Sequence, residues 1–187
     1  MNPHHKDETY LRQELEQIEK ARINPDGFGV LYEKYYKQIY IFINRRTDNE
    51  ELSSELCSLT FLKAMLNIQK YTDRGLPFSS WLFRIALNEV NMYYRKHKTE
   101  RCVSLESKAV RALAGESPAG PDEDSVKRLM LALGRLSEPD MQLIELRFFE
   151  ERAFAEVGEI VGITENNAKV RIYRILEKLK TLLKGRS

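Results

Sequence analysis

The spacing of apolar residues limits the possible folds of this chain more than any other feature, because it has the helical period almost throughout. Apolar side chains that recur every three to four residues line one face of an α-helix, whereas strands alternate. No two segments alternate as a pair of neighbouring strands would. We therefore expect an all-α protein. The predicted helices cover residues 7–22, 28–46, 50–68, 80–98, 126–136 and 137–149, with two more between 153 and 183.

The same spacing identifies the side chains that the helices should bury. The core face of the second helix is expected to consist of Phe28, Leu31, Tyr32, Tyr35, Ile39, Phe42 and Ile43. The third helix is expected to bury Leu52, Leu56, Leu59, Phe61, Ala64 and Ile68. Ser79 or Ser80 should cap the fourth helix, because a hydroxyl can accept a hydrogen bond from the backbone of the first turn. Ser137 should cap a later helix, with Asp140 at capping-box spacing.

A change of composition divides the chain into two domains. Residues 101–125 contain two glycines, two prolines and an acidic run, and they show little sustained periodicity. Such a segment is typical of a linker. We therefore expect an N-terminal helical extension over residues 1–24, a first domain over 25–100, the linker over 101–125 and a second domain over 126–187.

Composition and motifs exclude several classes of protein. The chain of 187 residues is 42% apolar, which supports real cores, and its formal net charge of +2 is too small to indicate nucleic acid by itself. No apolar run approaches the length of a membrane span and no signal-peptide core is present, so we expect a cytoplasmic protein. With two cysteines, neither a disulfide framework nor a metal site is expected. No Gly-rich phosphate loop or nucleophile–base pair stands out, so we expect no enzyme and no cofactor.

Residues 153–174 contain the start and stop signals of two helices joined by a tight turn. Phe154, Val157 and Ile160 recur at helical spacing in the first part. Gly162 then stands where a helix end favours a left-handed residue, and Thr164 can cap the following helix. A helix-turn-helix places its second helix in the DNA major groove. The segment therefore predicts DNA as a partner.

The second of these helices has one apolar stripe and one basic, amide-bearing face. The stripe consists of Ala168, Ile172, Ile175, Leu176, Leu179, Leu182 and Leu183, and the opposite face carries Asn166, Asn167, Val170, Tyr173 and Arg174. Residues 165–187 hold seven Lys or Arg against two Asp or Glu. This face suits contacts with phosphates and base edges, and Val170 could touch a thymine methyl group. The alternative is an ordinary amphipathic helix whose basic face is solvated.

The fourth predicted helix combines aromatic and basic side chains. Trp81, Phe83, Tyr93 and Tyr94 lie among Arg84, Asn88, Asn91, Arg95, Lys96, His97 and Lys98. Aromatic rings beside cations are what single-stranded DNA requires, because unstacked bases need a π-face and phosphates need positive charge. Trp81, Ile85 and Ala86 are expected in the core. The residues at the helix end are equally consistent with DNA contact and with a solvated surface.

Three stretches, residues 28–68, 77–98 and 129–183, resemble bacterial sigma factors of the sigma-70 superfamily, in the small extracytoplasmic-function (ECF) group. The strings that carry the resemblance are Phe61-Leu-Lys-Ala64, Trp81-Leu-Phe-Arg-Ile-Ala-Leu-Asn88 and Lys169-Val-Arg-Ile-Tyr-Arg174. Their order, with a linker between the second and the third, is that of the family. The resemblance implies a sigma-2 domain followed by a sigma-4 domain.

Such a protein would bind core RNA polymerase and direct it to promoter DNA, with the polymerase performing the nucleotidyl transfer. The implied contacts with the duplex −35 element are Glu165, Asn166, Asn167, Lys169, Val170, Arg171 and Arg174. The implied contacts with the melting −10 element, where a base flips into a loop at residues 71–80, are Tyr71, Arg74, Phe78, Arg84, Asn88, Asn91, Tyr94, Arg95 and Lys96. The implied polymerase contacts are Glu55, Ser58, Leu59, Leu62 and Lys63. An anti-sigma factor, often membrane-tethered in this group, is a further implied partner, and no small-molecule substrate is implied.

The chain departs from the family pattern in two helices. Where the family has Asp followed by Gln-Glu in the third helix, this chain has Glu55 followed by Ser58 and Leu59. Leu87 replaces a frequent Arg of the fourth helix, and Met92 replaces a frequent Asp. Two other classes of function therefore stay open. One is a regulator that uses only the helix-turn-helix, and the other is a sigma-like decoy or interaction protein that does not start transcription.

Overall fold

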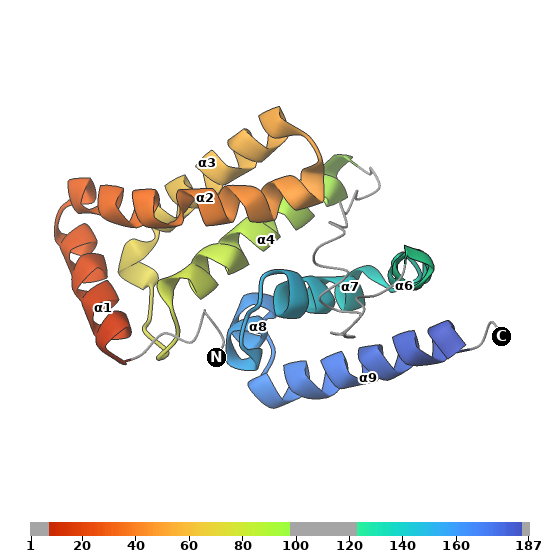
Figure 1. The fold of residues 1–187 in the computed structure, drawn as a ribbon. Coiled ribbons are helices and arrows are strands. Elements are labelled where there is room, and N and C mark those ends of the chain that lie inside the picture. The colour runs from red at the N-terminus through yellow and green to blue at the C-terminus, as the bar shows by residue number, and fades with distance from the viewer. Residues whose placement is uncertain (1–7, 98–122, 185–187) are drawn as a thin grey trace. The chain divides into compact units, whose positions relative to one another are not determined.

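The computed structural model describes residues 8–97 and 123–184, and within these two stretches every regular element is helical (Figure 1). This confirms the all-α prediction for the described chain. The chain divides into two compact units, and the division assigns the described residues 8–97 to one unit and most of residues 123–184 to the other. We call residues 8–97 the first unit and residues 123–184 the second unit. Among the described helices, none is long and apolar enough to cross a membrane.

The first unit is built on three long helices that pack against one another. These are α2 (Phe28–Thr47), α3 (Glu50–Leu66) and α4 (Phe78–His97), which Figure 1 shows in orange to green. The preceding helix α1 (Glu8–Ile23) contacts α2 and the short 3-10 turn Ile68–Lys70. A second 3-10 turn, Pro25–Gly27, joins α1 to α2 and is capped by the side chain of Asn24.

The core of the first unit follows the predicted periodicity with three exceptions. Leu31, Ile39, Phe42 and Ile43 are fully buried, whereas Tyr32, predicted in the core, is 40% exposed. Tyr32 lies at the edge of the apolar stripe. Its ring packs edge-on against Phe61, with 4.8 Å between centroids, and also lies 5.2 Å from the ring of Tyr36. Leu52 and Leu59 of α3 are likewise only half-buried.

Two helix ends differ from the prediction because tertiary contacts decide them. The third helix stops at Leu66, and Ile68 is buried in the 3-10 turn that follows. The fourth helix already begins at Phe78, so Ser79 and Ser80 lie buried in its first turn and do not cap it. The acceptor at this helix start is instead the Glu14 carboxylate of α1, 2.6 Å from the Phe78 nitrogen.

The second unit contains α6 (Glu123–Leu133), α7 (Glu138–Ile144), α8 (Phe154–Val161) and α9 (Glu165–Lys184). Helix α6 includes the last three residues of the predicted linker, the rest of which lies outside the described residues. Ser137 caps α7 as predicted, accepting a hydrogen bond from the Asp140 nitrogen at 3.4 Å. The predicted helix over 137–149 is divided, because Glu145–Phe149 forms a wider π-helical turn. Helix α9 packs against α6 and α7.

Candidate nucleic-acid and polymerase interfaces

The turn between α8 and α9 has the geometry of a helix-turn-helix. Helix α8 ends at Gly162, whose φ of 77° lies in the left-handed region, and the Ile163 nitrogen donates to the Gly158 carbonyl at 2.9 Å. Thr164 Oγ1 accepts a hydrogen bond from the Asn167 nitrogen at 3.2 Å and so caps α9. The predictions for Gly162 and Thr164 are therefore confirmed.

Gly158 allows the turn to pack closely onto α8. A Cβ atom at this position would lie 2.7 Å from the Ile163 carbonyl oxygen and 3.1 Å from the Glu165 nitrogen. Real Cβ atoms essentially never show a contact as short as 2.7 Å, and 3.1 Å is tighter than nine in ten of their contacts. The absence of a side chain at Gly158 is thus what lets α9 start directly against α8, and the sequence analysis did not identify this role.

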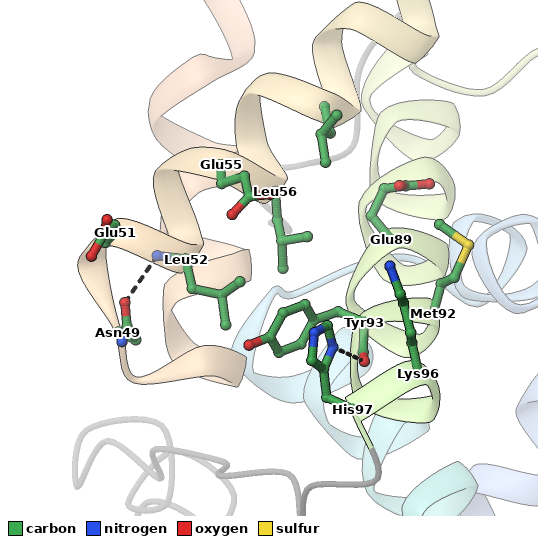
Figure 2. Close-up of a pocket in the computed structure, with 11 residues that line it drawn as sticks. Asn49, Glu51, Leu52, Glu55, Leu56, Glu89, Met92, Tyr93, Lys96 and His97 are labelled. Atoms are coloured by element: carbon green, nitrogen blue, oxygen red, sulfur yellow. Dashed lines mark hydrogen bonds between the residues drawn. The ribbon is translucent and has the colours of Figure 1, made fainter.

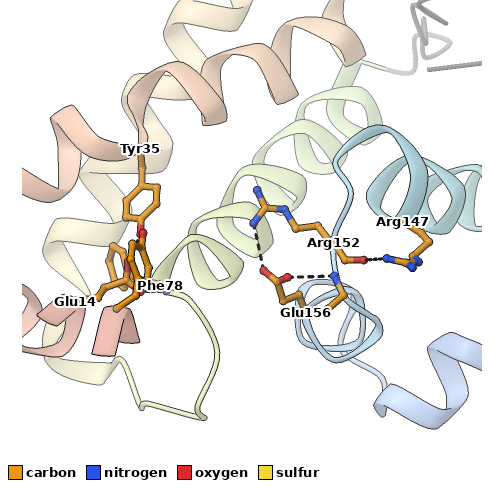
Figure 3. Close-up of polar contacts among 8 residues, drawn as sticks. Glu14, Tyr35, Phe78, Arg147, Arg152 and Glu156 are labelled. Atoms are coloured by element: carbon orange, nitrogen blue, oxygen red, sulfur yellow. Dashed lines mark hydrogen bonds and ion pairs between the residues drawn. The ribbon is translucent and has the colours of Figure 1, made fainter. Parts of the chain in front are cut away.

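Buried polar contacts hold the start of α8 in place (Figure 3). Glu156 accepts hydrogen bonds from the Ala153 nitrogen at 3.1 Å and from Arg152 at 3.2 Å. The side chains of Arg152 and Glu156 are both only 3% exposed. Arg147 donates to the Arg152 carbonyl at 2.8 Å. This network ties the segment before α8 to its first turn. No periodicity predicts it, because buried charges interrupt an apolar pattern.

Helix α9 buries one face and exposes the opposite one. Ala168, Ile172, Ile175 and Leu179 are buried, as predicted, whereas Leu183 near the end of the stripe is 36% exposed. Of the predicted −35 contacts, Arg171 is half-buried and the others are exposed: Glu165, Asn166, Asn167, Lys169, Val170 and Arg174. This face can therefore reach a DNA groove with amide, basic and apolar groups.

Tyr173 extends this exposed face, although the predicted contact set omits it. Its side chain is 54% exposed, and its ring lies 6.1 Å from that of Phe154 in α8. The guanidinium of Arg147 lies 4.7 Å from the centroid of Phe154. Tyr173 is thus backed by the start of α8. A phenol so placed can donate a hydrogen bond to a phosphate oxygen.

In the first unit, the predicted −10 residues separate into supporting and exposed groups. Tyr71 and Phe78 are 8% and 0% exposed, so neither side chain is presented at the surface, and their contact with DNA stays a prediction. Their rings pack with that of Trp81 in a cluster with centroids 5.2 to 5.4 Å apart. Burial also raises the pKa of the Tyr71 hydroxyl. These rings support the loop at residues 71–77, in which Arg74 is exposed.

The remaining −10 residues lie on α4. Arg84, Asn88, Asn91 and Arg95 recur at intervals of three and four residues, which places them along one face of the helix. Asn88 and Arg95 are exposed, as is Lys96, while Arg84 and Asn91 are half-buried. This row combines cationic and amide groups over about three turns of helix. The predicted core residues Trp81 and Ile85 are half-buried, and Ala86 is buried.

Tyr94 is anchored to the end of α2 by its hydroxyl, which donates to the Arg46 carbonyl at 2.9 Å. Arg46 is itself only 1% exposed, with its guanidinium 3.6 Å from the Phe42 ring centroid and a 2.9 Å hydrogen bond to the Phe42 carbonyl. Tyr94 therefore has a fixed ring orientation while remaining half-buried. A ring held in this way would lose little freedom on stacking with a base, as the predicted −10 contact requires.

The predicted polymerase residues share one face of α3. Glu55, Ser58 and Leu62 are exposed, whereas Leu59 and Lys63 are half-buried. Leu66 continues this face one turn beyond Leu62 and is 69% exposed, which the predicted set omits. These two leucines lie four residues apart, so they place apolar area on the same side of α3 as Glu55 and Ser58.

Lys63 has a structural partner that the sequence did not reveal. Its ammonium group lies 2.7 and 2.6 Å from the two carboxylate oxygens of Glu89. Glu89 is buried, at 5% exposure, so the pair links α3 to the middle of α4. A buried carboxylate requires a partner of this kind.

Beside this ion pair, α3 and the second half of α4 enclose an open groove of about 670 Å³ (Figure 2). Its floor is apolar, with acidic groups on the α3 side and Lys96 and His97 on the α4 side. The lining residues are Asn49, Glu51, Leu52, Glu55, Leu56, Leu59, Glu89, Met92, Tyr93, Lys96 and His97. The groove thus connects the predicted polymerase face to the predicted DNA face.

Comparison with known proteins identifies both units. Sigma-70 region 2 matches residues 31–100, and Sigma-70 region 4 matches residues 132–181. The ECF RNA polymerase sigma factor SigM of Bacillus subtilis is 30% identical over 81% of this chain and 92% of its own length. The ECF RNA polymerase sigma factor BldN of Streptomyces coelicolor is also 30% identical, over 90% of this chain, which spans 65% of that protein.

A solved structure has the same fold. It is a co-crystal structure of the sigma factor RpoE with the anti-sigma factor NepR from Bartonella quintana. The similarity covers 86% of this chain and 98% of that chain, with a TM-score of 0.57 and 19% identity. The two family matches follow one another along the chain, region 2 on the first unit and region 4 on the second. The chain belongs to the sigma-70 family of RNA polymerase sigma factors, in the ECF group.

Proposed function

We propose that this chain binds core RNA polymerase and directs it to promoters in the cytoplasm, using two separate DNA-binding surfaces. In the second unit, the exposed face of α9 would read the −35 element as duplex through Glu165, Asn166, Asn167, Lys169, Val170, Arg171 and Arg174. In the first unit, the loop at residues 71–77 and the α4 row would capture the −10 element as it melts. The polymerase, and not this chain, would supply the catalytic groups.

The observation that carries this proposal is the difference between the two surfaces. The α9 face presents amides and cations from a capped helix, as a reader of the major groove requires. The α4 surface instead places a fixed aromatic ring, Tyr94, beside the exposed Arg95 and Lys96. That combination favours unpaired bases, because a base can stack only after it has left the duplex.

Polymerase binding would use the α3 face. Its exposed leucines, Leu62 and Leu66, lie on the same helix as Glu55 and Ser58. Lys63 would act mainly through its pair with Glu89, which joins the polymerase face to α4. An anti-sigma factor is a further proposed partner, because the similar RpoE chain is seen in complex with one.

The decisive experiment is transcription in vitro. The full chain is added to sigma-free core polymerase with a genomic library of promoters, and promoter-specific transcripts are sequenced. We expect transcripts whose start sites share −35 and −10 sequences. Polymerase binding without any transcript would instead identify a decoy, and DNA binding without polymerase binding would identify a helix-turn-helix regulator.

A further inference from the structure

A single buried carboxylate connects α1 to two other helices of the first unit. Glu14 is 2% exposed and lies in the middle of α1. Its Oε1 atom accepts a hydrogen bond from the Tyr35 hydroxyl and pairs with the Lys34 ammonium at 3.1 Å, both on α2. Its Oε2 atom accepts the backbone N–H of Phe78 at 2.6 Å (Figure 3). Three elements therefore depend on one side chain.

The hydrogen bond from the Phe78 N–H to Glu14 gives a backbone donor at the start of α4 its acceptor. The first N–H groups of a helix have no partner within the helix, and a negative charge there also interacts favourably with the helix dipole. Phe78 is fully buried, so water cannot replace a lost acceptor. Glu14 therefore fixes the point at which the loop at residues 71–77 ends and α4 begins.

A second residue of α1 holds the other end of the same loop. The Arg22 guanidinium donates to the Ile68 carbonyl at 3.2 Å and to the Tyr71 carbonyl. In the reverse direction, Gln69 donates to the Arg22 carbonyl at 2.7 Å. Helix α1 thus forms hydrogen bonds at both ends of the loop. The bonded residues lie 46 to 64 positions apart in the sequence.

Between these two anchors, the loop projects its middle to solvent. Thr72, Asp73, Arg74 and Gly75 are exposed. Asp73 Oδ1 accepts the Gly75 N–H at 2.9 Å, and Gly75 has a φ of 69°, so the tip forms a defined tight turn. A site that receives an unstacked base gains affinity when its shape exists beforehand, because nothing then has to be ordered on binding.

We propose that α1 is a positioning element for promoter opening, in which Glu14 and Arg22 hold the loop at residues 71–77 in the shape that receives the displaced −10 base. This inference rests on the function proposed above and adds a role for the N-terminal helix. Neither residue touches DNA; both act through the loop that they anchor.

The test uses the full chain with core polymerase and two DNA probes from a promoter on which the wild-type protein is active. One probe carries a preformed bubble over the −10 element, and the other is a −35 duplex fragment bound by the chain alone. The variants are Glu14→Gln, which keeps the size of the side chain, and Arg22→Met, which keeps its length but removes the donors. Glu16→Gln is the matched control, because it makes the same change at an exposed position of α1.

We expect Glu14→Gln and Arg22→Met each to weaken binding to the bubble by about tenfold, since one buried hydrogen bond to a charged group corresponds to roughly that factor. Binding to the −35 duplex should not change, and Glu16→Gln should behave as the wild type on both probes. Hydrogen exchange of the peptide over residues 71–80 should accelerate in the first two variants only.

Ile43→Val is the control that separates a general loss of stability from a loss of loop positioning. It changes a buried core residue about 12 Å further along α2 from Tyr35. If it weakens bubble binding as much as Glu14→Gln does, the positioning role is wrong. Wild-type bubble affinity in Glu14→Gln and Arg22→Met would overturn it as well. Failure of the wild-type chain itself to start transcription would instead refute the proposed function, which keeps the two failures distinct.

Discussion

Gly158 offers a sharp test of how the helix-turn-helix is built, because two physical effects of replacing it by alanine have opposite signs. In a helix, alanine is favoured over glycine by about 1 kcal/mol. Against this, the new Cβ atom would lie 2.7 Å from the Ile163 carbonyl oxygen and 3.1 Å from the Glu165 nitrogen. The obstructing atoms are backbone, so no rotamer change can remove the clash.

Overpacking a core typically costs 1–3 kcal/mol, and a clash with rigid backbone lies at the upper end of that range. After subtraction of the helical gain, we expect Gly158→Ala to destabilise the second unit by about 2 kcal/mol. If the clash is relieved by moving the turn, α9 must also shift relative to α8. Binding to a −35 duplex should then fall even at temperatures where the protein remains folded.

The assay combines thermal unfolding with fluorescence anisotropy on the −35 duplex. Gly29→Ala is the matched control, because Gly29 lies in the first turn of α2 and a Cβ atom there meets nothing within 4 Å. It should leave stability unchanged or slightly raised. A Gly158→Ala protein that is as stable as Gly29→Ala and binds the duplex as tightly as the wild type would refute the reasoning.

Three further substitutions test other parts of the molecule. Arg174→Ala should weaken −35 binding and reduce the salt slope of log K by about 1, since one phosphate contact is lost; an unchanged slope would mean that Arg174 is only solvated. Tyr94→Ala should impair opening of the −10 element, followed with a fluorescent base, more than it impairs duplex binding, and equal losses would contradict its proposed stacking role. In a Cys102→Ser background, alkylation of Cys57 at pH 8 should be negligible until the protein is denatured, because burial raises the pKa of its thiol to about 12. Since this folded-state pKa lies above the ordinary value of 9.0, the contribution of Cys57 to stability should be complete below about pH 9 and lost as the pH rises towards 12, and titrating unfolding against a Cys57→Ala variant measures this.

Local features of the chain were sufficient to predict which face of α9 is exposed in the second unit. The spacing of Ala168, Ile172 and Ile175 identifies the buried side of α9, and its opposite side follows from helix geometry alone. Gly162 and Thr164 mark the turn because their conformational and capping preferences act within a few residues. These properties hold whatever the rest of the protein does.

The tertiary structure decided features that depend on residues far apart in the sequence. Tyr71 and Phe78 are aromatic residues of the kind that single-stranded DNA-binding surfaces use. Both are nevertheless buried, and their rings pack against that of Trp81. Ser79 has the chemistry of a helix cap, but the carboxylate of Glu14 performs this role from 64 residues away.

Lys63 illustrates the same division on the face of α3 that we propose binds polymerase. Its position on α3 follows from periodicity, while its pairing with Glu89 requires the packing of α3 against α4. Hydrophobic spacing indicates which side of each helix is buried. It carries no information about which residue of another helix that side contacts. Only the packing of whole helices brings a charge, a carbonyl or a ring to a particular partner, and in this protein that packing joined α1 to the loop that precedes α4.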